Sequence, residues 1–229
     1  MSCYKDGVKQ CPCDGGGGGG YLAPAFTSFG IFGQPSPIEV GDQIAANPTF
    51  VWTTSNPVNI VANSIDIIDV TGGAINIATG QANTGSYAAV YPAIQRTSAG
   101  SWQFQINGQN TLPAIFTRTY DVEWQWMLYY GESANAGPLS EAQIEALRVA
   151  ELGGSFARNY AMLAGGYKYI CYPVVLGVAT NFIDLGTGFP VAMDAPYTVL
   201  VTNTFGQTTN YRVHRTYNTL GGALTIVVS

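Results

Sequence analysis

Short stretches of alternating apolar and polar residues, separated by turn-forming residues, recur along most of this chain. The alternation is clearest in Ser64–Val70, Trp102–Ile106 and Tyr120–Trp126. A period of two residues places one side of an extended strand against a core and the other toward solvent. Further strands are predicted where short apolar runs are bounded by Gly, Pro, Asn or Ser, at 26–32, 38–44, 50–54, 167–172, 197–203, 209–216 and 224–228. This spacing predicts an all-β chain built from sandwiches.

Glycine-containing dipeptides predict tight turns between these strands. Gly72-Gly73 and Asn107-Gly108 tolerate the positive φ angles that two-residue hairpin loops require. Gly206 predicts a third turn, between the strands expected at 197–203 and 209–216. The strands on either side of each turn are therefore expected to pair as hairpins.

One helix is predicted directly after Pro138. Ser140 is suited to the N-cap position, and Gln143, three residues later, completes a capping box. Gly153-Gly154 provides the expected C-terminal stop. We expect this helix to mark the joint between two β regions.

Together these patterns predict two β-sandwich domains of the Ig-like kind, joined by one short α-helix and preceded by an extended N-terminal arm. A chain of 229 residues is long enough to bury two modest cores. The predicted segments are a Cys- and Gly-rich arm (1–25), a first sandwich (26–136), a helical linker (137–165) and a second, smaller sandwich (166–229).

The arm carries the most unusual local composition. The run of glycines from Gly15 to Gly20 loses too much backbone entropy to become ordered without a partner. We therefore predict an assembly arm that a neighbouring protein holds. Its marker residues are Cys3, Cys11, Cys13, Gly15, Gly20 and Tyr21.

The same three arm cysteines are the candidate metal ligands. Cys11 and Cys13 are separated by one residue, whereas structural zinc sites usually place two to four residues between thiols. We therefore expect no metal and no cofactor, with metal binding or an inter-chain disulfide through Cys3, Cys11 and Cys13 as the alternatives. Cys171 is the remaining thiol, so a disulfide framework within the folded body is excluded.

Charge is scarce in this sequence, since only 10% of the residues are Asp, Glu, Lys or Arg. An ordinary soluble domain carries about 25%. We expect part of this weakly charged surface to be buried against copies of the same chain. The net charge of -5 argues against nucleic-acid binding, and the apolar runs are too short for membrane insertion.

Residues suited to catalysis are few, and we predict that the chain is not an enzyme. The single histidine, His214, lies in an expected strand and is assigned a structural or surface role. No Gly-x-Ser-x-Gly nucleophile elbow accompanies it. A glycosidase would need two carboxylates across a sugar, but the expected alternation turns the candidates outward as solvated side chains. Those candidates are Asp66, Asp69, Asp121 and Glu123, and the residues expected to face outward are Asp66, Asp69, Gln103, Gln105, Glu123 and Gln125.

Aromatic side chains leave a choice between a sugar-stacking platform and core packing. Trp124 and Trp126 share a strand face with Val122, which favours the core. The remaining aromatic candidates for such a platform are Trp52, Trp102, Tyr129 and Tyr130.

Diffuse strand patterns in both halves resemble structural proteins of tailed bacteriophages. In the second half they are Tyr167–Pro173, Asn181–Asp184, Thr198–Asn203, Tyr211–Arg215 and Leu224–Ser229, similar to a terminal β domain of tail-fibre and baseplate appendages. In the first half they are Glu39–Gly41, Phe50–Asn56, Asn63–Asp69 and Asn83–Ser86, similar to the domain that commonly precedes it.

This resemblance implies a virion component that assembles in the host cytoplasm, commonly as a homotrimer, with its N-terminal part attached to other tail or neck proteins. The chain lacks coiled-coil heptads and β-helix repeats. A short connector or a head or neck decoration protein is therefore as consistent with the sequence as a tail fibre. A carbohydrate-binding adhesin module that recognises a host surface glycan is the alternative. A glycan-degrading enzyme on the same scaffold is the third hypothesis.

Overall fold

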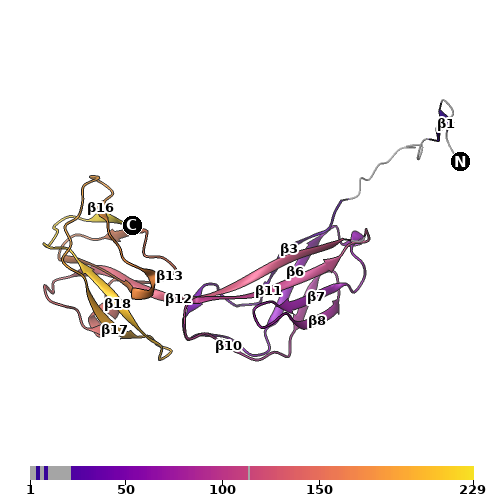
Figure 1. The fold of residues 1–229 in the computed structure, drawn as a ribbon, viewed down its shortest axis with the longest axis horizontal. Coiled ribbons are helices and arrows are strands. Elements are labelled where there is room, and N and C mark those ends of the chain that lie inside the picture. The colour runs from indigo at the N-terminus through magenta and orange to yellow at the C-terminus, as the bar shows by residue number, and fades with distance from the viewer. Residues whose placement is uncertain (1–3, 6–7, 10–21, 113) are drawn as a thin grey trace.

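The structure is a computed structural model that describes residues 4–5, 8–9, 22–112 and 114–229. Two β-rich lobes lie end to end (Figure 1). The fold is mostly β with several sheets, as the sequence predicts. Two short strands, β1 (Tyr4–Lys5) and β2 (Val8–Lys9), pair with each other ahead of the first lobe.

The first lobe is a sandwich of two sheets. Its elements are β3 (Ala25–Ile31), β4 (Ile38–Glu39), β5 (Gln43–Ile44), β6 (Thr49–Ser55), η1 (Pro57–Asn59), β7 (Ile65–Asp69), β8 (Ile75–Gln81), β9 (Gly85–Ala88), β10 (Ile94–Gln95), β11 (Gly100–Gln109) and the first half of β12 (Ile115–Ser133). Sheet β8-β7-β11-β12 faces sheet β3-β6-β9, while β5 and β10 form a separate pair.

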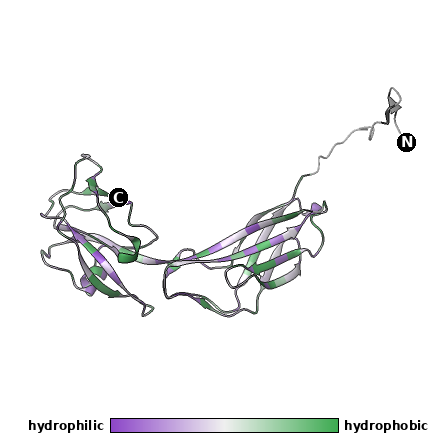
Figure 2. Cartoon of the chain, viewed as in Figure 1, coloured by the Kyte–Doolittle hydropathy of each residue, from purple (hydrophilic) through white to green (hydrophobic). Residues whose placement is uncertain are grey.

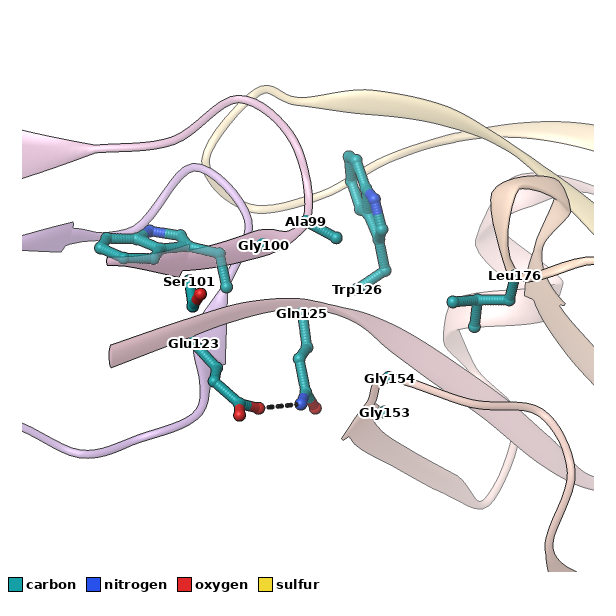
Figure 3. A pocket seen from close by; sticks show the side chains of 10 residues that line it. Ala99, Gly100, Ser101, Glu123, Gln125, Trp126, Gly153, Gly154 and Leu176 are labelled. Atoms are coloured by element: carbon teal, nitrogen blue, oxygen red, sulfur yellow. Dashed lines mark hydrogen bonds between the residues drawn. The ribbon is translucent and has the colours of Figure 1, made fainter. Parts of the chain in front are cut away.

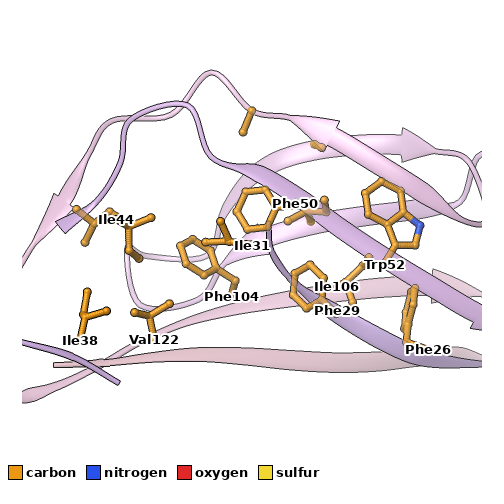
Figure 4. Packing of buried hydrophobic residues seen from close by; sticks show 14 of the residues in the cluster. Phe26, Phe29, Ile31, Ile38, Ile44, Phe50, Trp52, Phe104, Ile106 and Val122 are labelled. Atoms are coloured by element: carbon orange, nitrogen blue, oxygen red, sulfur yellow. The ribbon is translucent and has the colours of Figure 1, made fainter. Parts of the chain in front are cut away.

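Aromatic and branched side chains fill the space between these two sheets (Figure 4). Phe50 from one sheet meets Phe104 from the other edge to face, with ring centroids 5.1 Å apart. Alternating hydropathy is visible along the long strands (Figure 2), because successive side chains point to opposite faces. The first core includes Trp126 but no residue beyond it.

The second lobe contains the remaining elements. They are α1 (Glu141–Glu145), β13 (Val149–Gly153), β14 (Asn159–Met162), β15 (Tyr167–Pro173), η2 (Val174–Leu176), β16 (Phe182–Asp184), β17 (Tyr197–Thr202), β18 (Thr208–Arg215) and β19 (Leu224–Val228). Strands β13, β15, β18 and β17 assemble on the second half of β12, and sheet β14-β19-β16 packs against one face of this assembly.

Strand β15 is buried on both of its faces. Tyr172 and Ile170 belong to the core shared with sheet β14-β19-β16, whereas Tyr169 and Cys171 pack in a separate cluster with Ile144 of α1. The helix therefore covers the back of the second sheet. Because both faces are covered, the sequence of β15 is a largely apolar run and does not alternate between apolar and polar residues.

The long strand β12 is what joins the lobes. Its first half pairs with β11 as far as Trp124, and its second half pairs with β13 from Trp126 and with β15 from Tyr129. One nine-stranded sheet consequently runs through both lobes. The transition between the two cores falls next to Trp126 within this strand.

The predicted helical linker over 137–165 is therefore wrong. The capping box forms as predicted, with the Ser140 amide donating to Gln143 Oε1 at 2.9 Å, but α1 ends at Glu145. The segment that follows is strand β13, and Gly153 allows β13 to pack closely on β12, because a Cβ there would lie 2.3 Å from Leu128 Cδ1. The first sandwich also begins earlier than the predicted residue 26, because the side-chain amide of Asn59 already donates a hydrogen bond to the Leu22 carbonyl at 2.8 Å.

The turn predicted at Asn107-Gly108 is also wrong, because both residues lie inside β11. A Cβ on Gly108 would lie 2.5 Å from Phe116 Cζ, so this glycine admits an aromatic ring from the neighbouring strand. The other two predicted turns are confirmed. Gly73 has φ +102° and Gly206 has φ +75°, and the Asn203 amide donates to the Gln207 carbonyl across the latter turn at 2.9 Å.

Candidate functional sites

His214 lies in the second core and is 2% exposed. Its Nε2 shares a 3.0 Å hydrogen bond with the Tyr172 hydroxyl, which also accepts the Ala179 amide at 2.9 Å. The ring of Phe182 lies against the imidazole, with centroids 4.8 Å apart. Burial, aided by the nearby charge of Arg212, lowers the pKa of His214 to about 4. The side chain is thus a neutral core histidine at pH 7, in agreement with the predicted structural role.

Three of the four candidate carboxylates lie on outer strand faces, each with a neighbouring donor. Asp121 Oδ1 accepts Gln103 Nε2 at 2.9 Å, and Glu123 Oε2 accepts Gln125 Nε2 at 2.7 Å. Asp66 Oδ1 accepts the Gly80 amide at 3.1 Å. These side chains are exposed or half-buried, as predicted.

Asp69 is the exception, because it is completely buried and the prediction that it faces outward is wrong. Asp66 and Asp69 are three residues apart, so a strand turns them to opposite faces. Asp69 accepts hydrogen bonds from the Tyr91 hydroxyl and from the Gly72 amide, the latter at 2.8 Å. Burial and the hydrogen bond to Asp69 raise the pKa of Tyr91. The carboxylate fixes the loop after β7 to the core.

Core packing accounts for most of the aromatic candidates. Trp52, Trp124, Trp126, Tyr129 and Tyr130 are all buried, and Trp102 is partly buried against the first core. Trp124 Nε1 donates to the Asp42 carbonyl at 2.8 Å. These side chains therefore do not form a flat, exposed aromatic platform.

The candidate ligands of the arm lie outside the described residues. These are Cys3, Cys11 and Cys13, together with the other arm positions Gly15, Gly20 and Tyr21. Across residues 22–112 and 114–229, no group of three or more His, Cys, Asp or Glu side chains is arranged to hold a metal ion. Cys171 is buried, which raises the pKa of its thiol.

An open groove of about 400 Å³ lies at the junction of the lobes (Figure 3). It occupies the place where β11 begins at Gly100 and β13 ends at Gly153, both beside β12. Trp126 lines it, and Glu123 and Gln125 lie at its polar side, joined by their hydrogen bond. No pattern in the sequence indicated this groove, because its lining residues come together only where the two lobes meet.

A second contact between the lobes lies around Asn203. Its side-chain amide donates to the Val40 carbonyl of the first lobe, while its Oδ1 accepts the Phe205 and Gln207 amides at 3.1 and 2.9 Å. Gly41 lies directly against this hairpin, since a Cβ there would be 2.7 Å from Phe205 Cβ. We call the contact between residues 40–42 and 203–207 the interlobe clamp.

Carboxylates from both lobes surround this clamp. Burial raises the pKa of Glu39, and the neighbouring charges of Asp42 and of Glu145 in α1 act in the same direction, whereas the hydrogen bond with Asn203 opposes them. Asn203 was absent from the sequence-based candidates. Its only sequence signal is its position at the start of a predicted hairpin turn, which does not indicate a contact 163 residues away.

Lys168 is a further buried polar residue that the sequence analysis did not single out. Its Nζ donates to the carbonyls of Leu163 and Gly165, the latter at 2.6 Å. Burial lowers the pKa of this amine. The one sequence signal that could have indicated Lys168 is a lysine inside an otherwise apolar run. The two hydrogen bonds of its Nζ fasten the 163–165 loop.

No helix among the described residues has the length and apolar character needed to cross a membrane. Protein-family models, curated proteins and solved structures were all compared with this chain, and none of them matches it.

Proposed function

We propose that this chain is a non-catalytic structural protein of a tailed-bacteriophage virion, in the position of a tail-fibre, baseplate or connector appendage. It assembles with copies of itself and attaches to other virion proteins through its N-terminal arm. The observation that carries this proposal is the elongated body, in which the single strand β12 runs through both lobes (Figure 1).

The mechanical character of the body supports a structural role. A single strand of 19 residues passes from one core into the other, so bending the molecule requires bending a hydrogen-bonded sheet. The interlobe clamp adds a second connection, because a rotation of the lobes would break the Asn203 to Val40 hydrogen bond. Two such connections make a stiff spacer.

The surroundings of the titratable side chains support a role without catalysis. His214, Asp69 and Lys168 are buried and are each engaged in fixing a loop or a core contact. A general base works from a site that the substrate can reach. The geometry of these three residues instead contributes to the stability of the fold.

Mass spectrometry of purified virus particles, with stoichiometry, tests this proposal. We expect the chain among the particle proteins in a fixed copy number that is a multiple of three. Light scattering of the purified chain should give a homotrimer. Absence from purified particles together with a monodisperse monomer would refute the proposal, and electron microscopy with a labelled chain would distinguish a tail position from head or neck decoration.

A second candidate function, carbohydrate binding on the host surface, is favoured by the groove at the lobe junction. Leu176 and the small part of Trp126 that stays exposed give the groove an apolar side, and Ser101, Glu123 and Gln125 offer polar groups beside it, a combination suited to a small polar ligand such as a sugar. A glycan array with the purified chain tests it. Glu123→Ala should lower binding at least tenfold, while Asp121→Ala, on the same face of β12, should leave it unchanged; an array without binders rejects this function.

A further inference from the structure

Negative charge from both lobes converges on the joint between them. Glu39 lies in β4, directly before the interlobe clamp, and its side chain is half-buried. Asp42 belongs to the clamp, and Glu145 ends helix α1 of the second lobe. The charges of Asp42 and Glu145 both act on Glu39. Carboxylates from two lobes therefore share one contact.

The register of β4 on β12 explains why Glu39 faces the second lobe. Glu39 pairs with Gln125 of β12, so both side chains lie on the same face of the sheet. Tyr129 follows further along β12, at a position that turns its side chain to that face as well. It packs in one cluster with Ile144 of α1. The helix that covers this face also brings Glu145 to it.

The tyrosine and cysteine side chains around Glu39 are uncharged. Burial raises the pKa of Tyr129 to about 12, and the charge of Glu39 adds to this effect. Burial also raises the pKa of Tyr211 in β18, with Tyr129 and Glu39 acting in the same direction. Cys171 of β15 acts on both phenols, and its own thiol is kept protonated by burial. None of these groups carries charge at about pH 7.5 or below.

The charged side chains that remain near the joint have partners of their own. Glu141, in the first turn of α1, accepts a backbone amide of β17. Glu123 accepts a side-chain amide of its own strand at 2.7 Å. Arg96, whose backbone carbonyl accepts an amide of the clamp, donates from its guanidinium to the Ser101 carbonyl at 3.4 Å. Among the described residues, no Lys, Arg or His acts on Glu39, so its carboxylate is not neutralised by a cation.

Closing the clamp changes how tightly Glu39 holds a proton. Burial raises its pKa above the ordinary value of 4.5, and the charges of Asp42 and Glu145 add to this effect, whereas the hydrogen bond with Asn203 opposes them. In an open clamp Glu39 would meet water, lie farther from Glu145 and lose Asn203, so its pKa would return toward the ordinary value. The closed clamp therefore binds the proton more tightly than the open one.

We propose that the interlobe clamp is a pH-dependent joint, which holds the two lobes together more tightly in mild acid than at neutral pH because protonation of Glu39 removes unpaired charge from the contact. The inference goes beyond the proposed function, since it concerns the joint of the isolated chain. The extra stability of the closed clamp is complete below pH 4.5 and is lost as the pH rises through the raised pKa of Glu39. The body is thus stiffer in acid and bends more readily at neutral pH.

Single-molecule energy transfer between the lobes tests the joint. One dye is attached through a noncanonical amino acid at Val90 of the first lobe and the other at Phe189 of the second, both of which are exposed positions. The distribution of transfer efficiencies gives the ratio of open to closed molecules. We expect this ratio to be at least about threefold higher at pH 7.5 than at pH 4.5, because proton binding favours the closed state.

Glu39→Gln removes the titrating group but keeps an oxygen that accepts the Asn203 hydrogen bond. We expect this variant to be as closed at pH 7.5 as wild type is at pH 4.5, and to show no pH dependence. Asp66→Asn is the control, because it removes one negative charge from β7, which β11 separates from β12, and should respond to pH like wild type. His214 is present in both variants, so its titration does not produce a difference between them.

Glu145→Gln changes an exposed side chain of the opposite lobe and serves as the second test if Glu39→Gln disturbs the fold. Removing this like charge should lower the pKa of Glu39. Fewer molecules should then be open at neutral pH, and the midpoint of opening should move to lower pH. Carbon-13 NMR of the Glu39 carboxyl carbon follows that pKa directly.

Four results would each overturn the inference. They are a distribution that does not change between the two pH values, more open molecules in acid, an unchanged pH dependence in Glu39→Gln, and an unchanged midpoint in Glu145→Gln. Failure of the proposed function is a separate outcome. A chain that is absent from virus particles but shows the pH response keeps the joint and rejects the function, whereas a particle protein whose lobes ignore pH does the reverse.

Discussion

The side-chain amide of Asn203 in the second lobe donates a hydrogen bond to the backbone carbonyl of Val40 in the first, across a separation of 163 residues in sequence. The same side chain accepts two amides of its own hairpin turn through Oδ1. One residue thereby shapes a turn and connects two lobes. The two roles use different atoms, so substitution can separate them.

Asn203→Asp keeps the acceptor for the turn but removes the donor to Val40 and places a negative charge near Glu39. We expect the free energy of unfolding to fall by about 1–3 kcal/mol, the usual cost of leaving a buried polar group without its partner. Small-angle scattering should show a broader range of lobe orientations than in wild type. Asn203→Ala, which also loses the turn contacts, should be less stable still; equal rigidity in all three proteins would contradict the clamp.

Gly108→Ala tests the close packing between β11 and β12. The added Cβ would meet Phe116 Cζ at 2.5 Å and Ile65 Cδ1 at 2.9 Å, so the core has to shift. Overpacking of this kind typically costs about 1–3 kcal/mol. Chemical denaturation measures the loss, and Gly222→Ala is the control, because a Cβ there meets nothing within 4 Å. An unchanged free energy of unfolding for Gly108→Ala would show that β11 and β12 can move apart to accept a methyl group, which would contradict this close packing.

The buried His214 predicts that stability declines in mild acid. Its pKa falls from about 6.5 in the unfolded chain to about 4 in the fold, so the unfolded state binds the proton more tightly. The contribution is complete above pH 6.5 and is lost progressively as the pH falls through 6.5 toward 4. Between pH 7.5 and 4.5 the loss should be on the order of 2 kcal/mol.

Urea titrations at these two pH values measure the histidine contribution, with His214→Gln as the reference protein. Glutamine does not titrate, so this variant should lose less stability on acidification than wild type. The same pH dependence in both proteins would assign the effect to other groups.

The pair Tyr91 and Asp69 should be energetically coupled. Tyr91→Phe removes the hydroxyl that donates to the buried carboxylate and should cost about 1.5–3 kcal/mol, as is typical of hydrogen bonds to charged groups. Asp69→Asn and the double variant complete a thermodynamic cycle measured by denaturation. Additive losses would mean that Asp69 is held by the Gly72 amide alone.

Local sequence patterns were sufficient to predict strands such as β7, β11, β15 and β18 and two of the three turns, whereas β8, β9, β13, β14 and β16 were not predicted. The alternation at Tyr120–Trp126 placed Val122, Trp124 and Trp126 in a core, and the capping box at Ser140 formed. These predictions are correct because the two-residue alternation of a strand and the capping of a helix depend only on residues a few positions apart in the sequence.

The same local reasoning failed where a distant segment decides the outcome. The residues after Ala146 continue as β13 and not as helix, because Val149–Gly153 pairs with the end of β12. Gly108 was assigned to a turn, whereas its role is to admit the ring of Phe116.

The amino-acid sequence by itself determined that this chain is mostly β and sparsely charged, with a glycine-rich N-terminal segment. Only the tertiary structure decided that one strand serves both lobes, that Asp69 points inward, and that Asn203 reaches Val40. The physical reason is that composition and periodicity act over a few residues, whereas sheet pairing and interlobe contacts depend on segments that meet only after the chain has folded.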